Sequence, residues 1–174
     1  MSKADTAARA LACDLGLSSF PVDVEQVAKA LDIMVVRKAA AEDVSGMLIR
    51  RDGIVAIGVN SAHPETRQRF ALAHLIGHHQ MHRQRELILD TDQRLPLEAD
   101  RGGPLMSLPV DREEADANRF AAMLLAPPHA VRDAVLTASD ATAEDLLRTL
   151  ADQFGLSHAT MGYWLMALGM IVHP

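Results

Sequence analysis

The sequence predicts an α+β fold: a mostly helical single domain with a small antiparallel β-sheet. Its 174 residues suit one domain, and its hydrophobic fraction of 49% is normal for a globular core. The runs with strand character fall near residues 33–60, whereas helical spacing of apolar residues covers most of the remainder. We therefore expect residues 1–174 to form one domain built around that sheet.

The N-terminal segment is expected to form two helices and a strand. Residues 4–15 are rich in Ala and Leu and predict a helix, in which Cys13 is expected to be a core thiol. Asp23 is a suitable N-cap for a second helix that runs to about Leu31. Residues Ile33–Val36 are β-branched and apolar, which favours a strand. Because the chain has one cysteine, an internal disulfide is excluded.

A hairpin and a long helix follow the first strand. Ser45–Arg51 and Ile54–Asn60 flank Asp52-Gly53, which is a strong hairpin turn signal. The next segment, from about residue 64 to residue 82, has apolar residues on more than one side. This pattern predicts a helix that is buried in the protein.

The second half of the chain is expected to contain one long loop and three helices. Residues 83–110 carry many charges, a Gly-Gly pair and three prolines, which together predict a loop or flexible flap. The helices expected after it are about Asp111–Leu125, Ala143–Phe154 and Ala159–Leu168.

Charge and hydropathy exclude two classes of protein. The net charge of −6 argues against a chain that coats nucleic acid or an anionic membrane. No apolar run approaches the ~18 residues that a membrane helix needs. The N-terminus lacks the apolar core of a signal peptide, since charged and polar residues interrupt it. We expect a cytoplasmic protein.

The segment His74-Leu75-Ile76-Gly77-His78 differs by one residue from a zinc-peptidase motif. Histidines four apart lie one helical turn apart on one face, so both imidazoles can reach a single metal ion. In the H-E-x-x-H signature, the Glu after the first His is the general base. Leu75 holds that position here and cannot accept a proton. The chain thus keeps the metal-binding half of the motif and lacks the acid–base half.

A zinc site needs a third protein ligand, and two candidates lie on the later helix. Our preferred set is His74, His78 and Glu114 on zinc, with Glu113 as the alternative third ligand. Asn118 lies one turn after Glu114, where it can hydrogen-bond a ligating histidine and fix its tautomer. The two glutamates also suit a first helical turn, where acids stabilise the helix dipole.

Several blocks of the chain resemble the ImmA/IrrE family of metallopeptidases. RQRFALAHLIGHHQMH resembles the active-site helix of that family, and EEADANRFAAMLLAP resembles its downstream helix. SSFPVDVEQVAKALDIMVV, the hairpin VSGMLIRRDG and the C-terminal segment that begins at DLLRTLADQF also resemble it, in the expected order. The resemblance covers roughly residues 5–172.

The resemblance implies an α+β domain with a gluzincin-like zinc core. Carried over residue by residue, His74, His78 and Glu114 match the metal ligands of the family, and Leu75 falls where its catalytic Glu stands. Characterised members relieve repression by cutting a helix-turn-helix repressor that is often encoded beside them. We therefore expect a zinc-binding protein that acts on such a repressor, with peptidase activity impaired or lost as in a pseudoenzyme.

Two other hypotheses remain. The first is an active zinc endopeptidase in which another residue replaces the missing base. The candidates for that role are His82, Glu86, Asp90 and Asp92. The second is direct DNA binding, suggested by the helix-turn-helix outline around Gly155 and Ser157. Residues His158–Met170 contain no Lys or Arg, however, and a recognition helix normally brings such groups to DNA.

Overall fold

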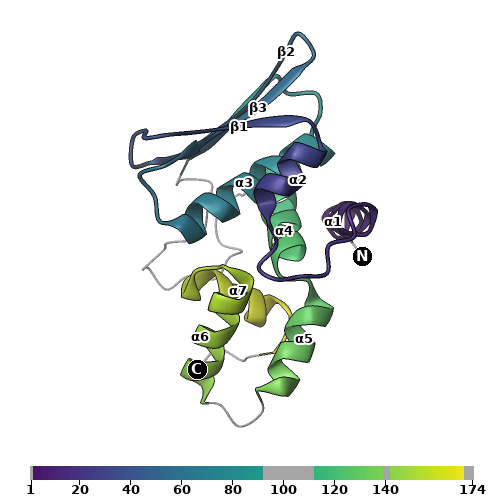
Figure 1. The fold of residues 1–174 in the computed structure, drawn as a ribbon, viewed down its shortest axis with the longest axis vertical. Coiled ribbons are helices and arrows are strands. Elements are labelled where there is room, and N and C mark those ends of the chain that lie inside the picture. The colour runs from purple at the N-terminus through teal and green to yellow at the C-terminus, as the bar shows by residue number, and fades with distance from the viewer. Residues whose placement is uncertain (1, 92–111, 139–141, 171–174) are drawn as a thin grey trace.

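The computed structural model describes residues 2–91, 112–138 and 142–170. Figure 1 shows a sheet at one end of the molecule, with helix α3 (Glu65–Met81) beneath it and α4 (Arg112–Leu125) beneath α3. Helix α1 (Lys3–Asp14) lies beside α4, and three further helices form the opposite end. The predicted α+β class is confirmed.

The first two helices begin at side-chain caps. Ser2 and Asp5 form a reciprocal capping box at the start of α1, and Asp23 caps α2 (Val24–Ala30) as predicted. Asp5 also pairs with Arg119 on α4, at 2.6 Å between Oδ1 and Nε, which ties α1 to α4. The prediction for Cys13 was wrong. Its side chain is exposed, because it lies on the side of α1 that faces away from the core.

The sheet has four strands in the order β1-β3-β2-β4. Strands β2 (Val44–Arg51) and β3 (Ile54–Asn60) form the predicted antiparallel hairpin. Strand β1 (Ile33–Lys38) pairs with β3 and runs parallel to it, so the expected all-antiparallel sheet is corrected to a mixed one. The chain reverses twice between β1 and β3, and these two strands therefore point the same way.

The predicted loop at residues 83–110 also needs correction. Its first part contains β4 (Leu87–Thr91), which pairs antiparallel with β2 at the edge of the sheet. Along β4 exposed Leu87 and Leu89 alternate with buried Ile88 and Asp90, as in a half-buried strand. The many charges around this short strand obscured it in the sequence. Residues 92–110, the remainder of the expected loop, lie outside the described residues.

The two faces of the sheet differ in what covers them. Leu48, Ile57 and Ile88 are buried on the inner face and belong to one core with residues of α3. The outer face carries apolar side chains that are 36% to 61% exposed. These are Met34, Val36, Met47, Ile49, Ile54, Leu87 and Leu89. The core therefore lies between the inner face and the helices.

Helix α3 is buried along most of its length, as its apolar pattern predicted. A glycine brings it unusually close to α4: a Cβ atom placed on Gly77 would lie 2.9 to 3.2 Å from the side chain of Phe120. A larger residue at position 77 would require the side chain of Phe120 or one of the two helices to shift. Gly77 thus allows the close approach that brings polar groups of both helices together.

The C-terminal part contains α5 (Pro128–Thr137), α6 (Ala143–Phe154) and α7 (His158–Ala167). Helix α5 was not predicted from the sequence, although Pro128 at its first turn is a helix-start signal. The indole N–H of Trp164 donates to the carbonyl of Ala126 at 2.8 Å and fixes α7 on the end of α4.

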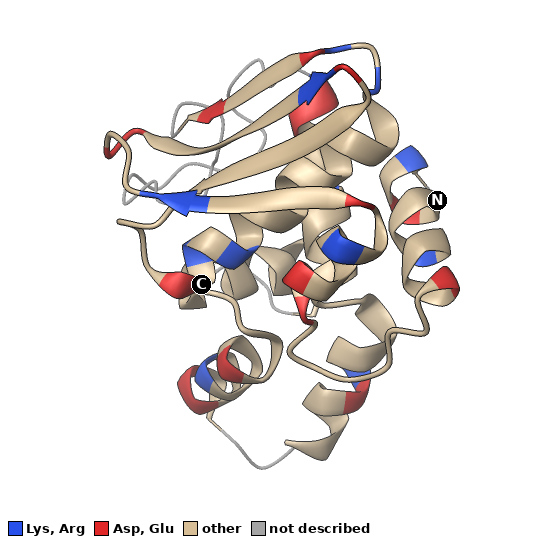
Figure 2. Ribbon diagram, turned by 45° about the horizontal axis from the view of Figure 1, so that its top comes forward, with Lys and Arg blue, Asp and Glu red and all other residues tan. Residues whose placement is uncertain are grey.

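Figure 2 shows that basic and acidic residues are interspersed along the strands and the surrounding helices. Among the described residues, every helix is too short or too polar to cross a membrane.

Candidate metal centre

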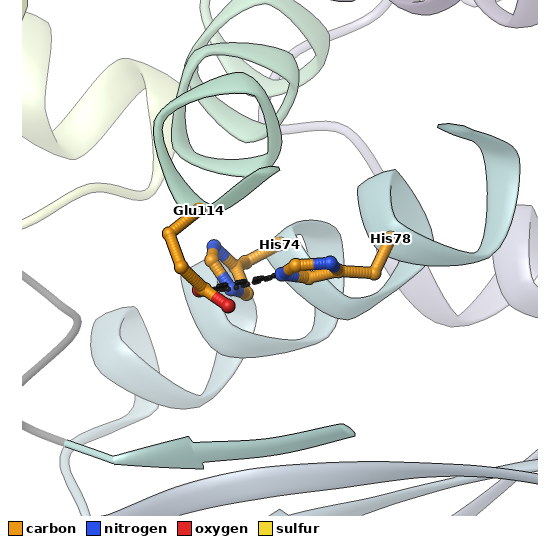
Figure 3. Close-up of side chains that lie close together, drawn as sticks. All are labelled: His74, His78 and Glu114. Carbon is orange, nitrogen blue, oxygen red and sulfur yellow. Dashed lines mark hydrogen bonds and ion pairs between the residues drawn. The ribbon is translucent and has the colours of Figure 1, made fainter. Parts of the chain in front are cut away.

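Three buried side chains from two helices meet at one point. His74 and His78 lie one turn apart on α3, and Glu114 reaches them from the first turn of α4 (Figure 3). The two Nε2 atoms are 3.1 Å apart, and each lies 3.3 Å from Oε2 of Glu114. All three residues are at most 4% exposed. The structure thus brings together the three residues that the sequence reading selected as ligands.

These separations suit a metal ion. Zinc–nitrogen and zinc–oxygen bonds are about 2.0–2.1 Å long, so the ligand atoms of a tetrahedral site lie about 3.3 Å apart. The observed distances of 3.1 to 3.3 Å match one face of such a tetrahedron. In addition, two imidazole nitrogens this close repel each other unless a proton or a cation lies beside them. The residues present therefore fit a metal ion.

The second nitrogen of each imidazole is also in contact with a polar group. His74 donates from Nδ1 to Oδ1 of Asn118 at 2.9 Å, as the spacing of Asn118 and Glu114 predicted. A neutral His74 then keeps its lone pair on Nε2, which faces the cluster. Nδ1 of His78 lies 3.1 Å from Nδ1 of His82. Both rings are thus oriented with Nε2 toward Glu114.

The charges of the cluster stabilise one another. Burial opposes the ionisation of Glu114, but hydrogen bonds and charges from His74 and His78 outweigh it and hold the pKa of this carboxyl far below its usual range. Burial likewise lowers the pKa of His74, yet the charges of Asp90 and Glu114 outweigh it and raise that pKa overall. A cation bound here would meet a carboxylate that is already ionised.

The alternative third ligand lies elsewhere. Glu113 forms an ion pair with Arg85, at 2.8 Å between Oε2 and Nη2, and its side chain is partly exposed. Adjacent residues of a helix point about 100° apart, so only one of the two glutamates can face α3. The cluster contains Glu114 and not Glu113.

Leu75 faces a different part of the molecule from the two histidines. Its side chain is 0% exposed and packs beneath strand β2, where a Cβ atom placed on Gly46 would lie 2.9 Å from Leu75 Cδ1. A glycine at position 46 therefore makes room for Leu75. The residue that replaces the expected base is a well-packed core residue.

The candidate substitute bases have different surroundings. Burial and the charge of His78 lower the pKa of His82, which contacts His78 directly. Glu86 is exposed, and Asp92 lies outside the described residues. Asp90 is 1% exposed, and its charge acts on His74. Of the three that the structure describes, only Asp90 is a buried carboxylate.

The sequence match agrees with this geometry. The family model for the IrrE N-terminal-like domain, a peptidase family, matches residues 28–166. The chain belongs to this family. None of the curated proteins matches the chain significantly. The resemblance to ImmA/IrrE proteins is thereby confirmed, and the chain is a metallopeptidase-family protein with a cluster able to hold a metal ion.

The surroundings of this cluster on the side of the sheet were not predicted from the sequence. The buried position of Asp90 depends on β4 pairing with β2, which was not expected. The available signal was the alternation of residues 87–91, with Asp90 on the same side as apolar Ile88.

Proposed function

We propose that this protein is a zinc-binding ImmA/IrrE member that regulates transcription through a helix-turn-helix repressor protein. Binding of the repressor is the main activity in this proposal, and peptide hydrolysis is impaired relative to members with an intact H-E-x-x-H motif. The observation that carries the proposal is the pairing of a preserved His74–His78–Glu114 cluster with a buried, apolar Leu75.

Zinc is the proposed metal because of the donor set. Two imidazole nitrogens and one carboxylate oxygen are the protein ligands of gluzincin-type sites, and such a site leaves one coordination position open. Magnesium and calcium prefer all-oxygen surroundings. When bound, zinc would supply Lewis-acid polarisation of a carbonyl group.

The reduced hydrolysis follows from the side chain at position 75. A positioned general base contributes about 10²–10⁴-fold to such reactions. Leucine has no proton acceptor, and its burial against Gly46 keeps that part of the site apolar.

Metal content is the first test. Elemental analysis of the purified protein should give about one zinc per chain, and His74→Ala should lose it. His129→Ala is the matched control, because His129 is exposed on α5 and is not a member of the cluster. If the unmodified protein takes up no zinc when zinc is supplied, the proposal that this is a zinc-binding protein is wrong.

The partner is tested with the helix-turn-helix repressor encoded nearest to the gene. Pull-down with the zinc-loaded protein should recover intact repressor, and His74→Ala should recover less. Rapid and complete cutting of that repressor by the unmodified protein would contradict impaired hydrolysis. Absence of any association would contradict the assigned partner.

One observation favours a second candidate, an active endopeptidase with a substitute base. The buried carboxylate of Asp90 lies on the strand that flanks β2, beside the cluster. This candidate differs from the first only in the rate of hydrolysis.

A further inference from the structure

Asp90 is an anomaly in the described part of the protein. It is 1% exposed, and neither of its carboxylate oxygens has a hydrogen-bond partner among the described residues. Burying a carboxylate without a partner is costly, so such groups are rare unless function requires them. The nearby guanidinium of Arg67 donates to the hydroxyl of Ser45.

The register of the sheet places Asp90 beside Leu75. Asp90 on β4 is directly opposite Gly46 on β2. Residues directly opposite each other in an antiparallel pair point to the same face of the sheet. A Cβ atom placed on Gly46 would lie 2.9 Å from Leu75 Cδ1, so this face of the sheet is directed toward α3. Asp90 therefore projects toward the same region of α3.

The pairing of β2 and β4 is irregular next to Asp90. The register of β2 and β4 shifts between Val44 and Gly46, immediately beside Asp90. Such irregularities redirect side chains and are frequent beside active sites. The electrostatic influence of Asp90 on His74 agrees with a carboxylate that faces the cluster.

We propose that Asp90 is the acid–base carboxylate of this site and replaces the glutamate absent at position 75. The carboxylate that other family members carry on the active-site helix is supplied here from the edge strand. This inference rests on the proposed function and names the residue responsible for the remaining hydrolysis.

The chemistry is that of ordinary peptide hydrolysis. Asp90 takes one proton from a water molecule as its oxygen forms a bond to the peptide carbonyl carbon. The C–N bond then breaks with its electron pair on nitrogen, and Asp90 returns the proton to the leaving amine. Water is the only co-reactant, and the carboxylate ends unchanged.

The test compares Asp90→Asn with Asp52→Asn in the zinc-loaded full chain. Asp52 is a suitable control, since it is exposed in the hairpin turn at φ 52°, a conformation that asparagine tolerates. The substrate is a proteome-derived peptide library with cleavage read by mass spectrometry. Asp90→Asn should lower cleavage by about 10²-fold or more, whereas Asp52→Asn should leave it unchanged.

Two readouts do not depend on activity. Zinc affinity, measured by chelator competition, should be the same in Asp90→Asn and Asp52→Asn. The melting temperature of metal-free Asp90→Asn should not fall, because the described residues donate no hydrogen bond to Asp90 that the change would remove. Asp90→Asn combined with Leu75→Glu should recover cleavage, since the carboxylate then returns to the helix.

Several results would overturn the inference. No cleavage by the unmodified zinc-loaded protein, or equal cleavage by Asp90→Asn, shows that Asp90 is not the base. A loss of about tenfold or more in zinc affinity in Asp90→Asn identifies a metal-holding group instead. A lower melting temperature identifies a structural carboxylate. In all these cases zinc binding by the unmodified protein remains, so failure of this inference is distinct from failure of the proposed function.

Discussion

The candidate metal centre lies between two walls that are built differently. On the helical wall, formed by α3 and α4, the polar atoms of His74, His78 and Glu114 contact one another, and a third helix position, Asn118, orients one imidazole. On the sheet wall, formed by β2 and β4, Gly46 makes room for Leu75 of α3, and Asp90 has no hydrogen-bond partner among the described residues.

The two halves of the motif lie on different faces of α3. Positions 74 and 78 face α4, whereas position 75 is rotated by about 100° and faces the sheet. A change from glutamate to leucine at that position leaves the side chains of His74, His78 and Glu114 in place. The ligand cluster is therefore independent of the residue that performs acid–base chemistry.

The largest effect is expected on the helical wall. Removing the imidazole in His74→Ala should weaken zinc binding by more than about 100-fold, since even partners outside the ligand set contribute 10–100-fold. Chelator competition measures the affinity, and circular dichroism checks that the helices remain. Unchanged zinc affinity would remove His74 from the ligand set.

The next largest effect is a gain on the sheet wall. Leu75→Glu should raise zinc-dependent peptide cleavage by at most about 10²-fold, because it adds a proton acceptor on the ligand helix where Asp90 already supplies one from the strand. Leu75→Gln is the matched control, since glutamine has the same shape and cannot act as the base. Equal cleavage by the two variants would show that the carboxylate at this position is not what limits hydrolysis.

A smaller loss is expected from the residue that orients His74. Asn118→Ala removes the acceptor for Nδ1 and should lower zinc affinity by about 10–100-fold. Asn118→Asp keeps an acceptor and should retain most of the affinity. If alanine and aspartate weaken binding equally, the hydrogen bond is not what holds the ring.

The spacing of the two helices can be tested directly. Gly77→Ala places a methyl group against Phe120 and should lower the free energy of unfolding by about 1–3 kcal/mol through overpacking. Zinc affinity should fall as well, because α4 carries Glu114 away from α3. Gly77→Ala combined with Phe120→Leu should remove the overpacking and restore zinc affinity. Failure to restore it would show that helix spacing does not control zinc affinity.

The smallest effect concerns the outer side of the helical wall. Burial raises the pKa of Asp5, but hydrogen bonds from Arg119 and Ser2 outweigh it and hold this pKa below its usual value. The contribution of Asp5 to stability is therefore present above about pH 3.9, the unfolded value, and is lost as pH falls through the lower folded value.

Asp5→Asn should accordingly destabilise the protein at neutral pH by about 1 kcal/mol or less, since Arg119 is partly exposed. The difference from the unmodified protein should shrink in acid denaturation experiments at lower pH. A constant difference across the acid range would show that the charge of Asp5 is not involved.

Local signals in the sequence predicted much of the fold. The caps of α2 and α7, at Asp23 and Ser157, and the Asp52-Gly53 turn act within a few residues, so their effect can be read from the chain. The ligand cluster was also predictable, because His74 and His78 are related by helical spacing and Glu114 by its place on the next long helix.

Features that depend on distant pairing could not be predicted. β1 runs parallel to β3 because the hairpin between them folds back, and β4 exists because it pairs with β2, about forty residues earlier. The environment of Asp90 follows from that pairing. Asp90 lies in a charged segment of the sequence. Nothing in that segment indicates that pairing of β4 with β2 buries this carboxylate.

The contact between Gly77 and Phe120 has a consequence for metal selectivity. It fixes the distance between two stiff helices, and so limits the separations of 3.1 to 3.3 Å among the three ligand atoms. Calcium, with bonds of about 2.3–2.6 Å, would need that triangle to widen and the helices to move apart. A residue that offers no ligand atom would thereby help to decide, by ionic radius, which cations this cluster can hold.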